Sequence, residues 1–258
     1  MVDAGPVQDG LIGEVAGLLR DADRVTALTG AGISTESGIP DFRGPQGVWT
    51  KDPKAERLST LQAYLEDPEL RVRAWRLRME HPAWDASPNA GHRALAELER
   101  KGKLHALVTQ NIDGLHQKAG TSPDRLIEIH GTLREVMCMS CDDRAPMEAA
   151  LARVRAGEPD PPCRTCGGIL KSATISFGQP LNQGDMERAR AAAEASDVFL
   201  AIGTSLTVYP VAYLPGVAAR AGARVVVMNA EPTAYDRSAD VVVRASIGRV
   251  LPEIVARV

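Results

Sequence analysis

The sequence predicts an α/β protein with a Rossmann-like, doubly wound parallel sheet and a small cysteine-bearing module inserted into it. The first observation is a series of short apolar runs separated by helical segments, which is typical of parallel strand–helix–strand units. These runs lie at residues 25–29, 104–109, 126–130, 197–202, 224–228 and 240–243. The second observation is that glycine, amide, carboxylate or hydroxyl groups come directly after most of them. The third is a pair of Cys-x-x-Cys motifs between the third and fourth runs.

Length and composition indicate a globular protein with one large domain and an insertion, or with two modest domains. Hydrophobic residues make up 44% of the 258 residues and charged residues 24%, whereas aromatic residues are sparse at 4%. The net charge of −3 provides no general field for holding nucleic acid. No apolar run approaches the length of a membrane span. We therefore expect a cytoplasmic protein that binds neither nucleic acid nor membranes.

The first apolar run leads into a glycine-rich turn that favours nucleotide binding. Gly30 and Gly32 would let backbone N–H groups approach a phosphate, and Ser34 offers a hydroxyl nearby. Thr35 stands where the usual Gly-x-Gly-x-x-Gly pattern has its third glycine. For this motif alone, a tight turn in any α/β protein is an equally good interpretation.

The loop after this turn combines three different chemical groups. Asp41 supplies a carboxylate, Phe42 an aromatic ring and Arg43 a cation, within a stretch rich in glycine and proline. This combination suits a loop that closes over a ligand.

Two further runs end in residues suited to binding or catalysis. Gln110, Asn111 and Asp113 follow the second run, and the carboxyl ends of parallel strands border the crevice where such sheets bind ligands. The alternative is a helix start capped by Asn or Asp. His130 closes the third run. A lone histidine is usually structural, but an imidazole with a pKa of about 6.5 is well suited to accept a hydroxyl proton near neutrality.

The four cysteines form two Cys-x-x-Cys pairs, which in a cytosolic chain indicate a metal site. The pairs are Cys138 with Cys141 and Cys163 with Cys166, separated by 21 residues. Four thiolates give the closed tetrahedral set of a structural zinc site, with no position left for a substrate. A thioredoxin-like redox pair is the alternative. The residues between the pairs predict a helix from Met147 to Arg155.

The segment from Leu58 to Glu80 predicts two helices that break near Asp67, because Pro68 cannot continue the first one. Four arginines follow at short spacing, and such a charge run is typical of a solvated helix face. They are Arg71, Arg73, Arg76 and Arg78.

These motifs together resemble the sirtuins, the NAD-dependent protein lysine deacylases, over nearly the whole chain from about Leu11 to Val258. The segments that carry the resemblance are 30–34, 38–43, 110–116 and 126–131, with a less complete match over 172–181, where Gln179 replaces the usual Glu and Ser176 an apolar residue. The resemblance implies that His130 is the catalytic base and that Asn111 helps to position the nicotinamide ribose. It implies NAD contacts from Gly30, Ala31, Gly32, Ser34, Asp41, Phe42, Arg43, Gln110, Asn111, Ile112, Asp113, Gly203, Thr204, Ser205, Asn229, Ala230, Glu231 and Ile247. It implies contacts with an extended acyl-lysine peptide from Ile175, Phe177 and Gly178.

The resemblance also gives expectations about domains and specificity. We expect a Rossmann-like NAD-binding domain at 1–134 and 172–258, and an inserted zinc-binding module at 135–171 that forms a smaller domain with helices from about 45–85. Family members that prefer succinyl-lysine or malonyl-lysine carry Tyr-x-x-Arg beside the acyl pocket. Here Trp75 stands in the tyrosine position and Arg78 in the arginine position. We therefore expect acetyl-lysine to be preferred.

Three alternatives to deacylation remain open at this stage. Mono-ADP-ribosyl transfer uses the same cofactor and the same leaving group. A Rossmann-like dehydrogenase would transfer hydride and produce NADH, and a zinc-bearing NAD sensor would bind the cofactor without releasing nicotinamide.

Overall fold

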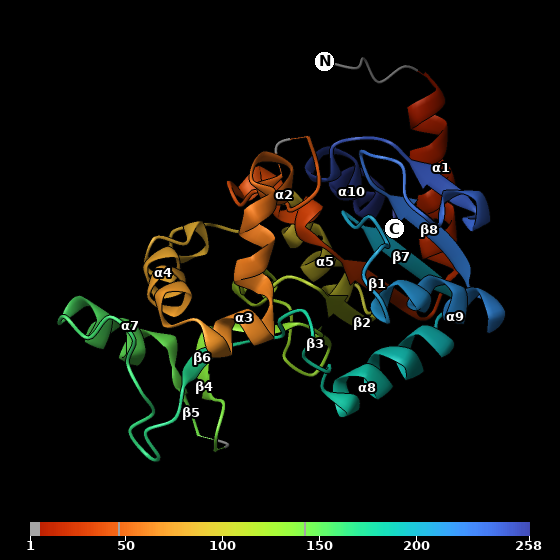
Figure 1. The fold of residues 1–258 in the computed structure, drawn as a ribbon. Coiled ribbons are helices and arrows are strands. Elements are labelled where there is room, and N and C mark those ends of the chain that lie inside the picture. The colour runs from red at the N-terminus through yellow and green to blue at the C-terminus, as the bar shows by residue number, and fades with distance from the viewer. Residues whose placement is uncertain (1–5, 46, 142) are drawn as a thin grey trace.

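The structure is a computed structural model that describes residues 6–45, 47–141 and 143–258. A six-stranded parallel sheet is the larger of its two sheets (Figure 1). Its strands are β1 (Val25–Thr29), β2 (Leu104–Thr109), β3 (Leu126–Glu128), β7 (Val198–Ile202), β8 (Arg224–Met228) and β9 (Val241–Val243). They are ordered β3-β2-β1-β7-β8-β9, and every neighbouring pair is parallel. The predicted fold class and all six predicted strands are confirmed.

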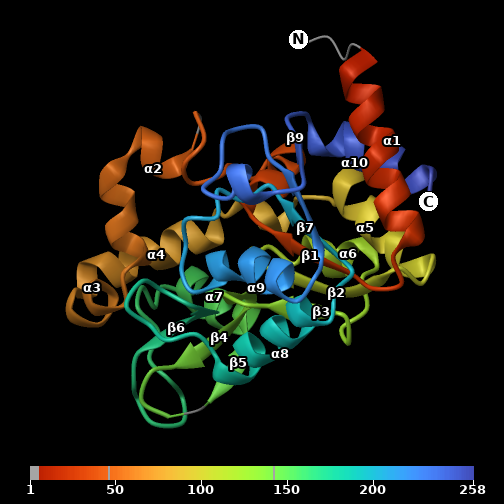
Figure 2. The ribbon, with the colours of Figure 1, turned by 90° about the vertical axis from the view of Figure 1, so that its right-hand side faces the viewer.

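Helices cover both faces of this sheet (Figures 1 and 2). One core contains α1 (Pro6–Asp21), α5 (Ala90–Arg100) and α10 (Ile247–Ala256). The other contains α8 (Gln183–Glu194) and α9 (Leu214–Arg220). Because β1 and β7 are buried at every position, their sequences are nearly continuous apolar runs instead of alternating patterns.

A small antiparallel sheet follows β3 in the chain, in the order β5-β4-β6. Its strands are β4 (Gly131–Cys138), β5 (Arg144–Pro146) and β6 (Leu170–Thr174). The predicted helix between the cysteine pairs is α7 (Met147–Arg155), and it packs into the same core as Trp75. The remaining short helices are α2 (Val48–Lys51) and α6 (Leu115–Ala119), with 3-10 turns at 31–37, 53–59, 82–84, 211–213 and 236–238.

The predicted break near Asp67 is confirmed, since α3 (Leu61–Glu66) ends there and α4 (Pro68–Met79) begins. Asp67 caps the new helix by accepting a hydrogen bond of 3.0 Å from Leu70 N. The solvated face predicted for the α4 arginines is wrong at two positions. The Arg71 side chain is only 11% exposed and pairs with Asp160 at 2.7 Å, and the Arg78 guanidinium is buried against Tyr64 and Ser172. Asp160 lies in the loop after α7 and Ser172 in β6, so segments far along the chain pack onto this helix beside the two side chains.

The order of the strands along the sheet reverses between β1 and β7, where the loops after both strands come together. Gly32 N donates to Gly203 O at 2.9 Å. A β-carbon on Gly30 would lie 2.7 Å from Gly203 O, and one on Gly32 would lie 2.8 Å from Gly203 Cα. Real β-carbons do not approach other atoms this closely, so these glycines are needed for the contact between the two loops.

Within the described residues, no helix is both long enough and apolar enough to cross a membrane.

We predict that Gly203→Ala destabilises the protein more than Gly222→Ala. Both glycines have positive φ, +62° and +100°, which costs an alanine roughly 1–2 kcal/mol. Gly222 has open space around it, whereas a β-carbon on Gly203 would also lie 2.4 Å from Ile33 N. Urea unfolding should therefore give a loss above about 2 kcal/mol for Gly203→Ala only. Equal losses in the two variants would contradict the close contact.

Candidate functional site

The carboxyl ends of β1, β2 and β7 are joined by hydrogen bonds into one surface. Gln110 N donates to Thr29 O at 2.9 Å, which links the ends of β2 and β1. The Gln110 side chain donates from Nε2 to Thr204 Oγ1 at 2.9 Å, which reaches the end of β7. The structure therefore brings together three of the segments that the sequence predicted to face one crevice.

Ser34 lies at the centre of a buried hydrogen-bond network. Its hydroxyl donates to Asp113 Oδ2 at 2.7 Å and accepts from Asn111 Nδ2 at 3.1 Å. Asn111 Nδ2 also donates to Gly30 O at 3.1 Å. The second carboxylate oxygen of Asp113 accepts from Leu115 N at 2.9 Å, so this residue also bonds the first backbone N–H of α6. Asn111 and Asp113 are thus fixed by protein contacts on the floor of the site.

Two histidines, His92 and His116, lie below the site beside this network. His92 Nδ1 accepts from Asn89 N at 3.4 Å, so its Nε2 carries the proton toward Ser34 Oγ, also at 3.4 Å. Burial lowers the pKa of His92 to about 4, although Asp113 opposes this shift. A neutral donor here leaves the Ser34 proton free to point at Asp113.

The His116 side chain is buried, with 1% of its surface exposed. Its Nε2 lies 3.0 Å from Thr29 Oγ1, whose own proton goes to Thr109 Oγ1 at 2.9 Å. The histidine must therefore donate, which leaves Nδ1 without a partner among the described residues. Burial, followed by the nearby His92 ring, lowers the pKa of His116 well below its ordinary value. Both rings are neutral at pH 7.

His130 lies two residues beyond β3 and is half-buried. Its Nδ1 is 3.2 Å from Gln110 O, which can only accept, so Nδ1 carries the proton and Nε2 keeps its lone pair. Burial lowers the pKa of His130, and the Gln110 bond opposes this shift. The ring is consequently neutral and able to accept a proton at pH 7.

The segment around Asp41, Phe42 and Arg43 lies beside the predicted peptide-binding segment. Phe42 and Phe177 remain 42% and 38% exposed. The ring of Trp49 touches both, with centroid distances of 4.7 Å to Phe42 and 5.5 Å to Phe177. Sequence reasoning did not assign Trp49 to the site. The sequence signal that could have assigned Trp49 to the site was its position six residues after Arg43.

The peptide-binding segment predicted from Ile175 to Gly178 continues from β6 and is partly paired within the chain. Phe177 N donates to Ser59 O at 2.7 Å, and Phe177 O accepts from Leu61 N at 2.9 Å. Ile175 N donates to His130 O at 2.8 Å. The backbone groups of Phe177 are therefore engaged already, which the sequence did not indicate.

The remaining predicted cofactor contacts lie farther along the carboxyl edge of the sheet. Thr204 and Ile247 are buried, whereas Ala230 and Glu231 are exposed. Asn229 follows β8, and its Nδ2 donates to Glu231 O at 2.7 Å. Ser205 Oγ lies 2.8 Å from Thr207 Oγ1. Except for Ile247, which starts α10, these residues occupy the loops after β7 and β8.

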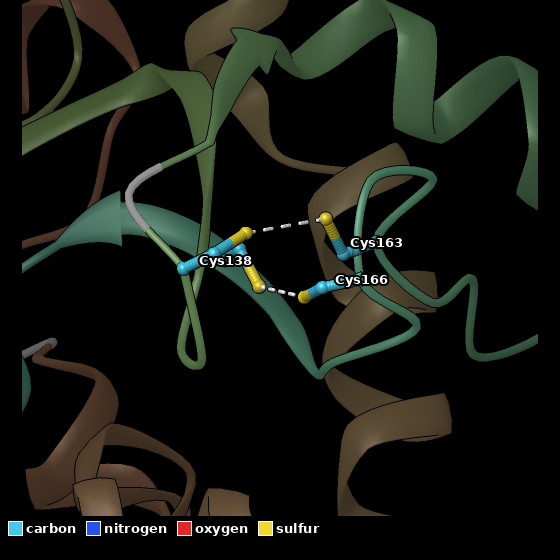
Figure 3. A group of neighbouring side chains, drawn as sticks. Cys138, Cys163 and Cys166 are labelled. Carbon is cyan, nitrogen blue, oxygen red and sulfur yellow. Dashed lines mark hydrogen bonds between the residues drawn. The ribbon is translucent and has the colours of Figure 1, made fainter.

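The four cysteines come together as predicted, with all Sγ atoms within 4.8 Å of one another (Figure 3). Cys138 and Cys166 are separated by 3.5 Å between sulfur atoms, and Cys141 and Cys163 by 3.8 Å. A disulfide needs about 2.05 Å, whereas Zn–S bonds of about 2.3 Å place tetrahedral sulfur atoms about 3.8 Å apart. The set therefore fits one structural zinc ion and does not fit a redox disulfide.

Backbone donors support the same interpretation. Ser140 N donates to Cys138 Sγ at 3.3 Å, and Gly168 N donates to Cys166 Sγ at 3.4 Å. Such bonds stabilise thiolates, which are the form that binds metal. With four protein ligands the ion has no open position, so its contribution is to hold β4 and the 163–166 loop together.

Comparisons with known proteins agree with this geometry. The Sir2 family profile matches residues 30–210. NAD-dependent protein deacetylase 2 of Streptomyces coelicolor is 53% identical over 230 residues, covering 89% of this chain and 95% of the relative. NAD-dependent protein deacetylase 1 of Pyrobaculum aerophilum is 44% identical over 247 residues, covering 95% and 93%. A solved Sir2 structure bound to acetylated peptide has a TM-score of 0.84 at 30% identity and covers 95% of this chain and 97% of its own.

We predict that Cys138→Ser lowers both zinc content and thermal stability, because three thiolates cannot complete the tetrahedral set. Metal analysis and melting followed by circular dichroism measure the two effects. Ser140→Ala is the matched control, since it keeps four thiolates and the backbone donor. If a chelator removed the zinc and left the fold and melting temperature unchanged, the structural role would be wrong.

Proposed function

Since this chain belongs to the Sir2 family, we infer that it is an NAD-dependent protein deacylase that removes acetyl groups from lysine side chains. The products are free lysine, nicotinamide and O-acyl-ADP-ribose. The co-substrate supplies the C1′ carbon of its nicotinamide ribose, to which the acyl oxygen adds as nicotinamide leaves.

The observation that carries the proposal is the orientation of His130. With Nδ1–H committed to Gln110 O, the free Nε2 is the atom that accepts a proton from a ribose hydroxyl. The same loop from β2 supplies Asn111, whose amide is oriented by Gly30 O and Ser34 Oγ. A base and a positioning amide held by neighbouring strand ends suit a reaction in which a ribose must be both placed and deprotonated.

The proposed substrate is an acylated lysine within an extended segment of a protein. Support comes from the segment at 175–178, where Ile175 O and Gly178 N have no hydrogen-bond partner among the described residues. Backbone groups of this kind can pair with a peptide strand without reading its side chains. Because the Phe177 groups already bond to Ser59 and Leu61, we assign the peptide contacts of Phe177 to its exposed ring.

Mono-ADP-ribosyl transfer remains the second candidate, because it needs the same cofactor and the same departure of nicotinamide. Deacylation leaves O-acyl-ADP-ribose in solution, whereas transfer leaves ADP-ribose on a protein. Incubation with NAD and an acetyl-lysine peptide, followed by mass spectrometry of the products, separates the two. The same reaction mixture excludes a dehydrogenase if no NADH absorbance develops.

We predict that His130→Ala lowers turnover at least ~10²-fold while fold and NAD affinity stay close to those of the wild type, because only the proton acceptor is lost. Release of nicotinamide and deacylated peptide measure turnover. His105→Ala is the matched control, as this half-buried histidine lies near the start of β2, at the opposite end of that strand from the site.

The pH profile provides a second readout of the same assignment. Since the pKa of His130 lies below its ordinary value near 6.5, the neutral ring predominates above that range. For the wild type, kcat/KM should rise as pH increases through the acidic range and level off by neutrality. Near-normal turnover in His130→Ala would contradict the assignment of His130 as the catalytic base.

The surroundings of Arg78 bear on the choice of acyl group. Its guanidinium donates to Ser172 Oγ at 2.8 Å, and its Nε has no partner among the described residues. Burial lowers the pKa of Arg78. Trp75 Nε1 donates to Asp160 Oδ1 at 3.3 Å, so the indole does not serve as a second donor beside the arginine. A charged acyl group would meet a guanidinium that is already bonded to Ser172 in place of the two-residue clamp.

We therefore predict that acetyl-lysine is preferred over succinyl-lysine by at least about tenfold in kcat/KM, since desolvation of the succinyl carboxylate is poorly compensated. One peptide carrying each acyl group in turn gives the comparison. Arg76→Met, an exposed arginine of the same helix, is the control for Arg78→Met. A succinyl preference that disappears in Arg78→Met but survives in Arg76→Met would show the opposite specificity.

A further inference from the structure

Trp49 is attached to the loop that contains Asp41, Phe42 and Arg43. Its backbone N donates to Phe42 O at 3.0 Å, and Val48 N donates to Asp41 O at 2.9 Å. These two bonds join the start of α2 to Asp41 and Phe42, which belong to the loop proposed to cover the cofactor.

The Trp49 ring bridges two parts of the proposed site. On one side are Phe42, at a centroid distance of 4.7 Å, and the Arg43 guanidinium, 4.6 Å from the indole centroid. On the other side is Phe177, with ring centroids 5.5 Å apart. Aromatic pairs and cation–ring pairs at these distances attract each other, so the position of one ring influences the next.

Phe177 belongs to a segment that is connected to the catalytic loop. Its backbone bonds to Ser59 and Leu61 hold it in place, and two residues earlier Ile175 N donates to His130 O at 2.8 Å. The Phe177 ring is therefore carried by a segment whose backbone is bonded to the backbone of His130.

Phe42, Trp49 and Phe177 form an aromatic row, and its two outer rings are open to ligands. Phe42 and Phe177 are 42% and 38% exposed, whereas Trp49 is half-buried between them. A ligand that covers Phe42 or Phe177 orders one end of the row, and Trp49 is the ring that contacts both ends.

We propose that Trp49 is a positioning residue that couples cofactor binding to acyl-peptide binding. A cofactor that orders the loop at 41–43 fixes Trp49, which in turn fixes Phe177 for the peptide. By linkage, the peptide raises cofactor affinity by the same factor. The inference rests on the proposed function, since it takes 41–43 as the cofactor loop and 175–178 as the peptide segment.

The test measures peptide affinity by calorimetry with and without saturating ADP-ribose, which lacks the nicotinamide leaving group and permits no turnover. In the wild type, ADP-ribose should tighten binding of an acetyl-lysine peptide at least about fivefold. In Trp49→Ala the factor should fall below about twofold, and Trp49→Phe should restore most of it. The reciprocal titration of ADP-ribose should give the same factors.

Tyr213→Ala is the control, because it removes another ring that contacts an aromatic neighbour, Tyr209, at a centroid distance of 4.6 Å. Its coupling factor should equal that of the wild type. If Trp49→Ala does not fold by circular dichroism, Phe177→Leu tests the other side of the same contact and should also lower the factor.

Two results would overturn the proposal. One is weaker binding of both ligands to Trp49→Ala with an unchanged coupling factor, which makes Trp49 a plain contact residue. The other is the absence of coupling in a wild type that releases nicotinamide from NAD and acetyl peptide, which leaves the proposed function intact. Failure of the wild type to release nicotinamide would instead overturn the proposed function.

Discussion

The contact between the loops after β1 and β7 sets the shape of the whole site. Gly30 and Gly32 approach Gly203 so closely that no β-carbon fits between the loops. This contact occurs where the strand order reverses, so it determines how far apart the flanking loops stand. The sequence suggests that these glycines leave room for a phosphate. In the structure they also leave room for the protein's own backbone, and the loop after β2 is then held against both strands through Gln110.

Polar groups in the site are oriented by a consistent set of donors and acceptors. His92 donates to Ser34, Asn111 donates to Ser34, and Ser34 donates to Asp113. Along this series each bond has a defined donor and acceptor, so the series has one favoured arrangement, and such buried networks hold their members rigidly. His130 lies outside this network, and the one hydrogen bond of its ring among the described residues is to a backbone carbonyl. The structure thus separates the rigid floor of the site from the group with a free lone pair.

Local patterns made the strands, the helix break at Asp67 and the cysteine cluster predictable from the sequence. Each depends on neighbouring residues or on a fixed spacing. The environments of Arg78 and Trp49 were not predictable in this way. Arg78 bonds to Ser172 of β6, which lies more than ninety residues later, and Trp49 meets Phe177 across a still longer separation. A charge run on one helix contains no information about the distant segment that packs on it. The hydrogen-bond partner of His116 was unpredictable for the same reason, because it is Thr29 of β1.

The two neutral histidines beneath Ser34 also make the fold sensitive to acid. In an unfolded chain each imidazole would have a pKa of about 6.5, whereas burial lowers the pKa of His92 to about 4 and that of His116 well below its ordinary value. Below about pH 6.5 the unfolded chain therefore binds protons that the folded chain does not accept, and folding stability falls as pH decreases toward 4. The rings are only 4.8 Å apart, so two charges would also repel each other. The same burial that orients the floor of the site thus sets a lower limit to the pH range in which this protein remains folded.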